Sequence, residues 1–84
     1  MMSGYVDVEA LFTRDGQVIP RRVFIKEAQG FSYCPVEDLQ GSIAAVSEDG
    51  LAELCFLCRI AGAAYALFYE GDHRWRVEGR LAEC

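Results

Sequence analysis

Short β-prone segments, each separated from the next by a glycine or a polar turn, recur along almost the whole 84-residue chain. Such a pattern is typical of a β-meander, a barrel or a sandwich. We predict strands near residues 5–14, 17–27, 31–34, 42–48, 51–60, 64–70 and 74–79. Because a chain of this length supports one hydrophobic core, residues 1–84 are predicted to form a single β domain.

The turns indicate which strands pair. Asp15-Gly16 predicts a two-residue hairpin turn, since both positions tolerate positive φ. Further turns are expected at 48–50, at Ala61-Gly62 and at 71–73. Pro35 and the residues that follow it predict a bend or one short helical turn near 36–40. Residues 51–68 are rich in alanine and leucine, which leaves a helix there as an alternative.

The Ala61-Gly62 turn fixes the register of the two strands that it joins. It pairs Ile60 with Ala63, and successive pairs then align residues 58 with 65, 56 with 67, and 54 with 69. A three-residue loop at 71–73 pairs Glu70 with Arg74 and extends the same apolar face into the last strand. The predicted central core is Leu54, Phe56, Leu67, Tyr69, Trp75 and Val77.

The opposite face of these strands is expected to be solvated, because it carries Glu53, Arg59, Glu70, Arg74, Arg76 and Glu78. The same face also carries four apolar residues, Cys55, Leu57, Ala66 and Phe68. A small barrel cannot bury both faces of one hairpin within itself. We therefore predict a homodimer or another protein partner at this patch. The alternative is that the N-terminus or residues 35–41 fold over it.

The net charge of −5 disfavours nucleic acid as a partner, since affinity for phosphate backbones depends on lysine and arginine. Four arginines leave this partner open as an alternative. They are Arg21, Arg22, Arg74 and Arg76, and Tyr5 and Phe24 could lie near them to form a mixed aromatic and cationic groove.

No catalytic, metal or cofactor site can be assembled from the sequence. Cys55 and Cys58 are three residues apart and point to opposite faces of a strand, while Cys34, Cys84 and His73 are scattered. His73 is expected to be a solvated turn residue, and the acidic pairs at 37–38 and 48–49 to be turn or cap residues. The N-terminal residues lack the basic and apolar runs of a secretory signal, which predicts a cytoplasmic protein with reduced thiols.

Three C-terminal segments carry a resemblance: residues 58–62 (CRIAG), 66–72 (ALFYEGD) and 74–78 (RWRVE). They are similar to a group of short, uncharacterised bacterial proteins that end in an Arg-Ile-Gly turn, a Leu-Phe-Tyr strand and a strand containing tryptophan. The resemblance extends loosely to residues 12–20 and implies a structural pattern with no established activity. Relatives have an Asp-Gly turn where this chain has residues 71–73, and Cys55 and Cys58 do not belong to the pattern.

Together these patterns predict an all-β fold, in which a curved antiparallel sheet closes into a small SH3-like or related barrel. The expected function is a non-enzymatic interaction module that self-associates through the outer patch. An enzyme or small-ligand binder would need a pocket with converging titratable groups, which the sequence does not provide.

Overall fold

The computed structural model describes residues 3–27 and 30–79, which form seven strands and no helix. The strands are β1 (Ser3–Phe12), β2 (Val18–Glu27), β3 (Gly30–Glu37), β4 (Ile43–Val46), β5 (Ala52–Ile60), β6 (Ala63–Gly71) and β7 (Arg74–Gly79). All seven predicted strands are therefore present, with ends that shift by up to three residues. The helical alternative for residues 51–68 is wrong, because this segment forms most of the β5–β6 hairpin.

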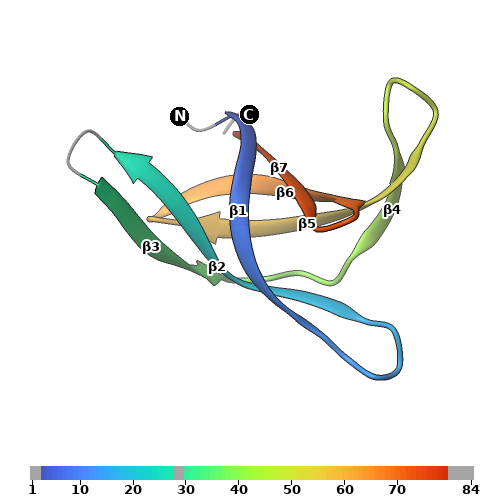
Figure 1. Ribbon diagram of the computed structural model, residues 1–84, viewed down its shortest axis with the longest axis horizontal. Coiled ribbons are helices and arrows are strands. Elements are labelled where there is room, and N and C mark those ends of the chain that lie inside the picture. Colours follow the sequence, from blue (N-terminus) through green and yellow to red (C-terminus); the bar gives the residue numbers. More distant parts are fainter. Residues whose placement is uncertain (1–2, 28–29, 80–84) are drawn as a thin grey trace.

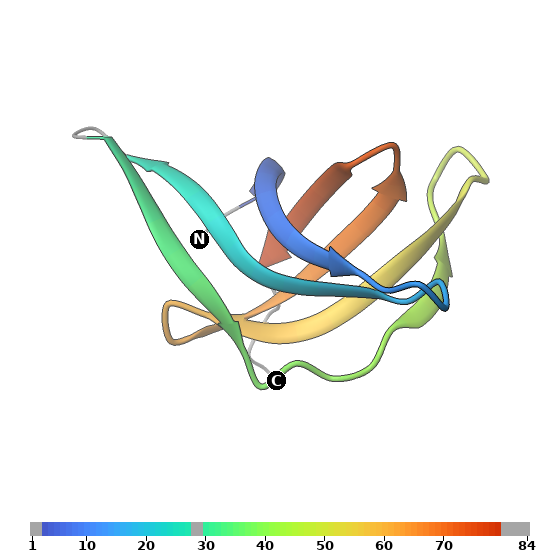
Figure 2. The same ribbon diagram turned by 60° about the horizontal axis from the view of Figure 1, so that its bottom comes forward.

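The sheet closes on itself. Its strand order is β3-β2-β1-β7-β6-β5-β4, all neighbours are antiparallel, and β3 also pairs with β5. The closing pairs are Val36 with Ile60 and Glu37 with Arg59. Six strands thus form a barrel, while β4 pairs with β5 outside the ring (Figures 1 and 2). The prediction of a small, SH3-like antiparallel barrel is confirmed.

The β5–β6 hairpin has the predicted register, from Ile60 opposite Ala63 to Leu54 opposite Tyr69. Its two turn residues, Ala61 and Gly62, have φ of 52° and 81°, as a type I′ turn requires. A type I′ turn has the same twist as the strands that it joins. β5 and β6 therefore pair regularly from the residues next to the turn, Ile60 and Ala63, onwards.

The β6–β7 connection differs from the prediction. Its turn contains two residues, Asp72 and His73, with φ of 52° and 60°, and Gly71 rather than Glu70 pairs with Arg74. Glu70 is the extra residue of a bulge, since Tyr69 still pairs with Trp75 as predicted. The loop is therefore one residue shorter than predicted, and the extra residue lies in β6 as the bulge.

The β1–β2 connection also corrects the sequence prediction. Thr13 N donates to Gln17 O at 2.9 Å and Gly16 N to Thr13 O at 3.1 Å, which gives a loop of three residues, 14–16. Only Gly16 in this loop has positive φ, at 90°, so the chain uses a type I turn followed by a bulge glycine. The β4–β5 loop at 48–50, predicted as a turn, has the same pattern between Ser47 and Leu51.

No helical turn forms near 36–40. Val36 and Glu37 belong to β3, and Asp38 bends the chain with φ of 51°. Gln40 N then donates to Leu57 O at 3.0 Å. Pairing with β5 thus satisfies the backbone groups that a helical turn would otherwise have bonded internally.

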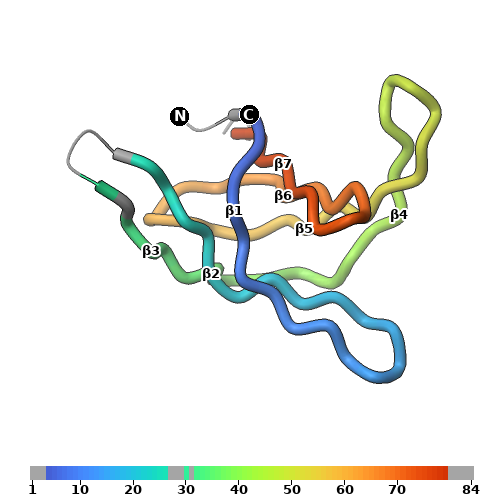
Figure 3. Tube along the Cα trace, in the orientation of Figure 1, coloured from blue at the N-terminus to red at the C-terminus, as the bar shows by residue number. Residues whose placement is uncertain are grey.

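The core fills the inside of the barrel. Its buried members are Val23, Phe56, Cys58, Ile60, Tyr65, Leu67, Trp75 and Val77. Four of the six predicted core residues are in this set, and the other two, Leu54 and Tyr69, are half-buried against it. Val23 was not predicted, because β2 pairs with β1 and β3, and Val23 meets the C-terminal core residues only through closure of the barrel. Figure 3 traces the chain around the barrel, in which β1 lies between β2 and β7.

We expect Ala61→Asn to stabilise the protein by about 0.5–1 kcal/mol, because asparagine tolerates the left-handed conformation better than alanine does. Urea denaturation followed by Trp75 fluorescence would measure the change. Ala63→Asn, two residues away in regular β6, is the matched control and should not stabilise. Equal effects of the two changes would contradict the assigned turn.

Candidate functional site

One row of side chains crosses the outside of five strands. Ile43 of β4 lies opposite Cys55, Cys55 opposite Phe68, Phe68 opposite Arg76, and Arg76 opposite Tyr5 of β1. Directly opposed residues in antiparallel strands point to the same face of the sheet. Trp75 and Val77, the neighbours of Arg76 along β7, are buried in the core, so this row faces outward.

The predicted outer apolar patch consists of Cys55, Leu57, Ala66 and Phe68. Its pairs, Cys55 with Phe68 and Leu57 with Ala66, are those that the sequence predicted. Ala66 is buried at 8% exposure, and the other three are half-buried. Ile43, at 52% exposure, extends the apolar row beyond these four residues. Sequence analysis missed Ile43 because its place in the row depends on how the short strand β4 pairs with β5.

Within residues 3–27 and 30–79, neither candidate segment folds over the patch. The N-terminal strand β1 lies beside β7 as the next strand of the sheet. The 38–42 segment runs along the edge of β5, and Leu39 lines a groove with Leu54 and Phe56, whose side chains belong to the inner face. The half-buried state of the patch therefore comes from its neighbours in the sheet.

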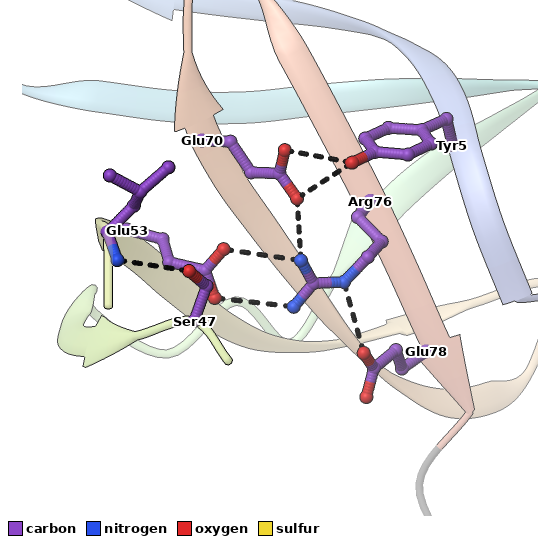
Figure 4. Close-up of polar contacts among 7 residues, drawn as sticks. Tyr5, Ser47, Glu53, Glu70, Arg76 and Glu78 are labelled. Carbon is purple, nitrogen blue, oxygen red and sulfur yellow. Dashed lines mark hydrogen bonds and ion pairs between the residues drawn. The ribbon is translucent and has the colours of Figure 1, made fainter. Parts of the chain in front are cut away.

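Arg76 binds three glutamates beside the patch (Figure 4). Its Nη1 donates to Glu70 at 2.6 Å, both Nη atoms donate to Glu53 at 3.2 and 3.3 Å, and Nε donates to Glu78 at 3.0 Å. Tyr5 Oη donates to Glu70 at 3.0 Å. The guanidinium carbon also lies 4.3 Å from the centre of the Phe68 ring, so a fixed cation covers part of this aromatic face.

This cluster corrects the expectation of a freely solvated charged face. The Glu53 side chain is only 3% exposed and that of Arg76 is 22% exposed. The hydrogen bonds to Glu53 are the largest influence that raises the pKa of Arg76 above its usual value, so the guanidinium remains charged. Long-range pairing of β5, β6 and β7 brings these charges together, and no local sequence signal shows it.

The cluster borders an open groove of about 490 Å³ between the β4–β5 loop and the β6–β7 turn. Acidic side chains outnumber basic ones in its lining, which includes Glu48, Asp49, Glu53, Glu70, Asp72, Glu78, Arg74 and Arg76. His73 is exposed in the adjacent turn, as predicted, and its ring lies 5.5 Å from that of Phe12. Among the described residues, no group of three or more His, Cys, Asp or Glu side chains is arranged to hold a metal ion.

The four arginines of the nucleic-acid alternative are divided between two strands. Arg21 and Arg22 lie on β2, Arg74 and Arg76 lie on β7, and β1 separates the two strands. Both Arg21 and Arg22 are exposed, because a bulge lets Arg21 fall between the paired residues Pro20 and Arg22.

Carboxylates or aromatic rings of the same chain contact three of these arginines, namely Arg22, Arg74 and, as described above, Arg76. Arg22 Nε lies 2.6 Å from Glu9, and this hydrogen bond lowers the pKa of the Glu9 carboxyl. The Arg22 guanidinium also lies 5.7 Å from the Tyr33 ring, which in turn packs against Phe24. Arg74 lies 5.3 Å from the Tyr5 ring, at a separate place on the surface. The predicted single groove of aromatic and cationic residues does not form.

The cysteines have different environments. Cys58 is buried in the core, whereas Cys55 faces outward and Cys34 is half-buried against the core. The two residues of the Cys55–Cys58 pair therefore point to opposite faces, as predicted, and cannot converge on one ion. Cys84 lies outside the described residues.

We expect Arg76→Ala to destabilise the protein by about 3 kcal/mol, because it leaves the Glu53 carboxylate buried without its cation. Urea denaturation would measure the loss. Arg22→Ala is the matched control, since its partner Glu9 is 49% exposed and water can replace the ion pair. The Arg76 cluster would lose its assigned role if both variants proved equally stable.

The described residues contain no helix that could span a membrane. Comparison with protein-family models, with curated proteins and with solved structures gives no significant match to this chain.

Proposed function

We propose that this protein is a non-enzymatic interaction module that self-associates through its outer apolar patch. The supporting observation is that Phe68 lies in an outward apolar row with Cys55 and Ile43, and no described segment crosses this row. A domain with one small core has no second layer to cover that face. A second copy supplies such a layer.

Burial supplies the driving force for the contact. Full burial of a phenylalanine or leucine side chain stabilises a complex by about 1.5–3 kcal/mol relative to exposure. Phe68 and Leu57 are half-buried in the single chain, so each gains part of that amount when a second patch covers it. In a two-fold contact both copies bury the same residues, so the gain in free energy from burial is doubled.

The Arg76 cluster forms a polar rim for this contact. Its carboxylates and the guanidinium already bind one another, so an apolar neighbour can approach Phe68 without breaking the cluster. An apolar centre beside satisfied charges is the usual arrangement of a specific protein interface.

The sign of the salt effect separates this function from nucleic-acid binding. Two copies of a chain with a net charge of −5 repel one another, so salt should strengthen self-association by screening. Binding to nucleic acid would instead weaken with salt. The nucleic-acid alternative has less support here, because glutamates bind Arg22 and Arg76 within the chain.

We expect Phe68→Glu to lower the solution mass of the protein, because it places a carboxylate at the centre of the contact. Light scattering coupled to size-exclusion chromatography would measure the mass, at low and at moderate salt. Tyr33→Glu is the matched control, since Tyr33 is 65% exposed on β3, away from the patch. A folded Phe68→Glu variant with the wild-type mass would rule out the proposed contact.

A further inference from the structure

The short strand β4 has one open edge. Among the described residues it pairs only with β5, through Ile43–Cys55, Ala44–Leu54, Ala45–Glu53 and Val46–Ala52. Figures 1 and 3 show β4 at the margin of the molecule, outside the closed ring of strands. Its other side therefore faces away from the barrel.

The hydrogen-bonding pattern shows which backbone groups point to the open side. Ser47 N donates to Leu51 O at 2.9 Å, so this pair is a hydrogen-bonded one. In antiparallel strands such pairs alternate with pairs that make no hydrogen bond to each other. Ala45 and Ile43 consequently bond to β5, and the N–H and C=O groups of Ala44 and Val46 point to the open edge.

This edge lacks most of the usual devices that block pairing with another strand. Exposed edges in proteins commonly carry lysine, proline or a bulge. Residues 42–47 (SIAAVS) contain no charge, no proline and no register shift, and Val46 is 72% exposed. Shortness is the only protective feature that β4 has.

We infer that β4 pairs antiparallel with β4 of a second copy about a two-fold axis at Ala44. In this register Ala44 faces Ala44 of the second copy, and each N–H bonds to the C=O of the other. Val46 faces Ser42 of the second copy and makes the next hydrogen-bonded pair. Ile43 lies beside Ala45 of the second copy on the outer face, so both chains keep their faces aligned.

Symmetry and the neutral sequence of β4 favour a second copy as the occupant. The chain has a net charge of −5, and residues 42–47 are a neutral segment at which two acidic molecules can approach. In the inferred register the position of Glu48 corresponds to that of the uncharged Gln40 of the second copy, so no like charges face each other directly. The small alanine at the axis brings no bulky side chains into opposition. The two-fold contact uses the open edge of both copies, so this contact joins two chains and no more.

This contact goes beyond the proposed function because it uses a different surface and a different chemistry. The outer patch gains free energy from apolar burial, whereas the β4 edge forms backbone hydrogen bonds. Phe68 lies two strands away from the open edge, with β5 between β6 and β4. Each contact can therefore be removed while the other remains.

The test is a set of four variants compared with the wild type by light scattering coupled to chromatography. Ala44→Pro removes the N–H that points to the open edge, and it leaves the hydrogen bonds to β5 intact. Ala44→Val, which retains the N–H, is its control. Circular dichroism and Trp75 fluorescence would establish that each variant is folded. Phe68→Glu and the double variant complete the set.

With both contacts present, we expect the wild type to exceed the mass of two 9.4 kDa chains. Ala44→Pro and Phe68→Glu should each give a mass of two chains, and the double variant should give one. A folded Ala44→Pro variant with the wild-type mass overturns the β4 contact alone. A Phe68→Glu variant with the wild-type mass overturns the outer-patch contact alone, and a monomeric wild type overturns both.

Amide hydrogen exchange of the wild type tests the β4 contact without any variant. The Ala44 and Val46 amides should exchange about tenfold or more slowly at high protein concentration than after dilution, because pairing protects them. The Ile43 and Ala45 amides bond to β5 and should change much less. Fast exchange of the Ala44 and Val46 amides at all concentrations overturns the inference. This result stands even if the Ala44→Pro variant fails to fold.

Discussion

The enclosed core and the position of β4 both depend on the two closing pairs, Val36 with Ile60 and Glu37 with Arg59. These pairs join β3 to the C-terminal half of β5 and turn the sheet into a barrel with one enclosed core. A chain of 84 residues buries too little surface for a second layer, so closure is how it encloses its apolar side chains. Closure also places β4 outside the ring, because one edge of β5 binds β6 and the other is shared between β3 and β4.

The faces of β5 and β6 could be predicted from the sequence because their register depends on a local feature. The Ala61-Gly62 turn adopts positive φ at both positions, and strict alternation then assigns every later residue to a face. One turn thus placed Phe56 and Leu67 in the core and Phe68 outside. The bulge at Glu70 shifted one pair near the turn but restored the register at Tyr69 and Trp75.

Features that depend on long-range pairing could not be predicted. Glu53 has a sequence neighbourhood typical of an exposed strand residue, yet Arg76 from β7 reaches it across β6 and both are largely buried. Val23 enters the core because the closed barrel makes β2 and the C-terminal strands share one interior. In each case the partner lies on another strand, and no single turn residue specifies the contact.

The outer patch and the β4 edge are adjacent, because Ile43 of β4 pairs with Cys55 of the patch, but they place different demands on a single chain in water. Water can bond to the backbone groups of Ala44 and Val46, so the open edge costs the monomer little free energy. No such substitute exists for Phe68 and Leu57, whose apolar surface is stabilised only when another surface covers it. Apolar burial is therefore the source of affinity in the proposed assembly. Strand pairing, which requires aligned donors and acceptors, defines how two copies are oriented.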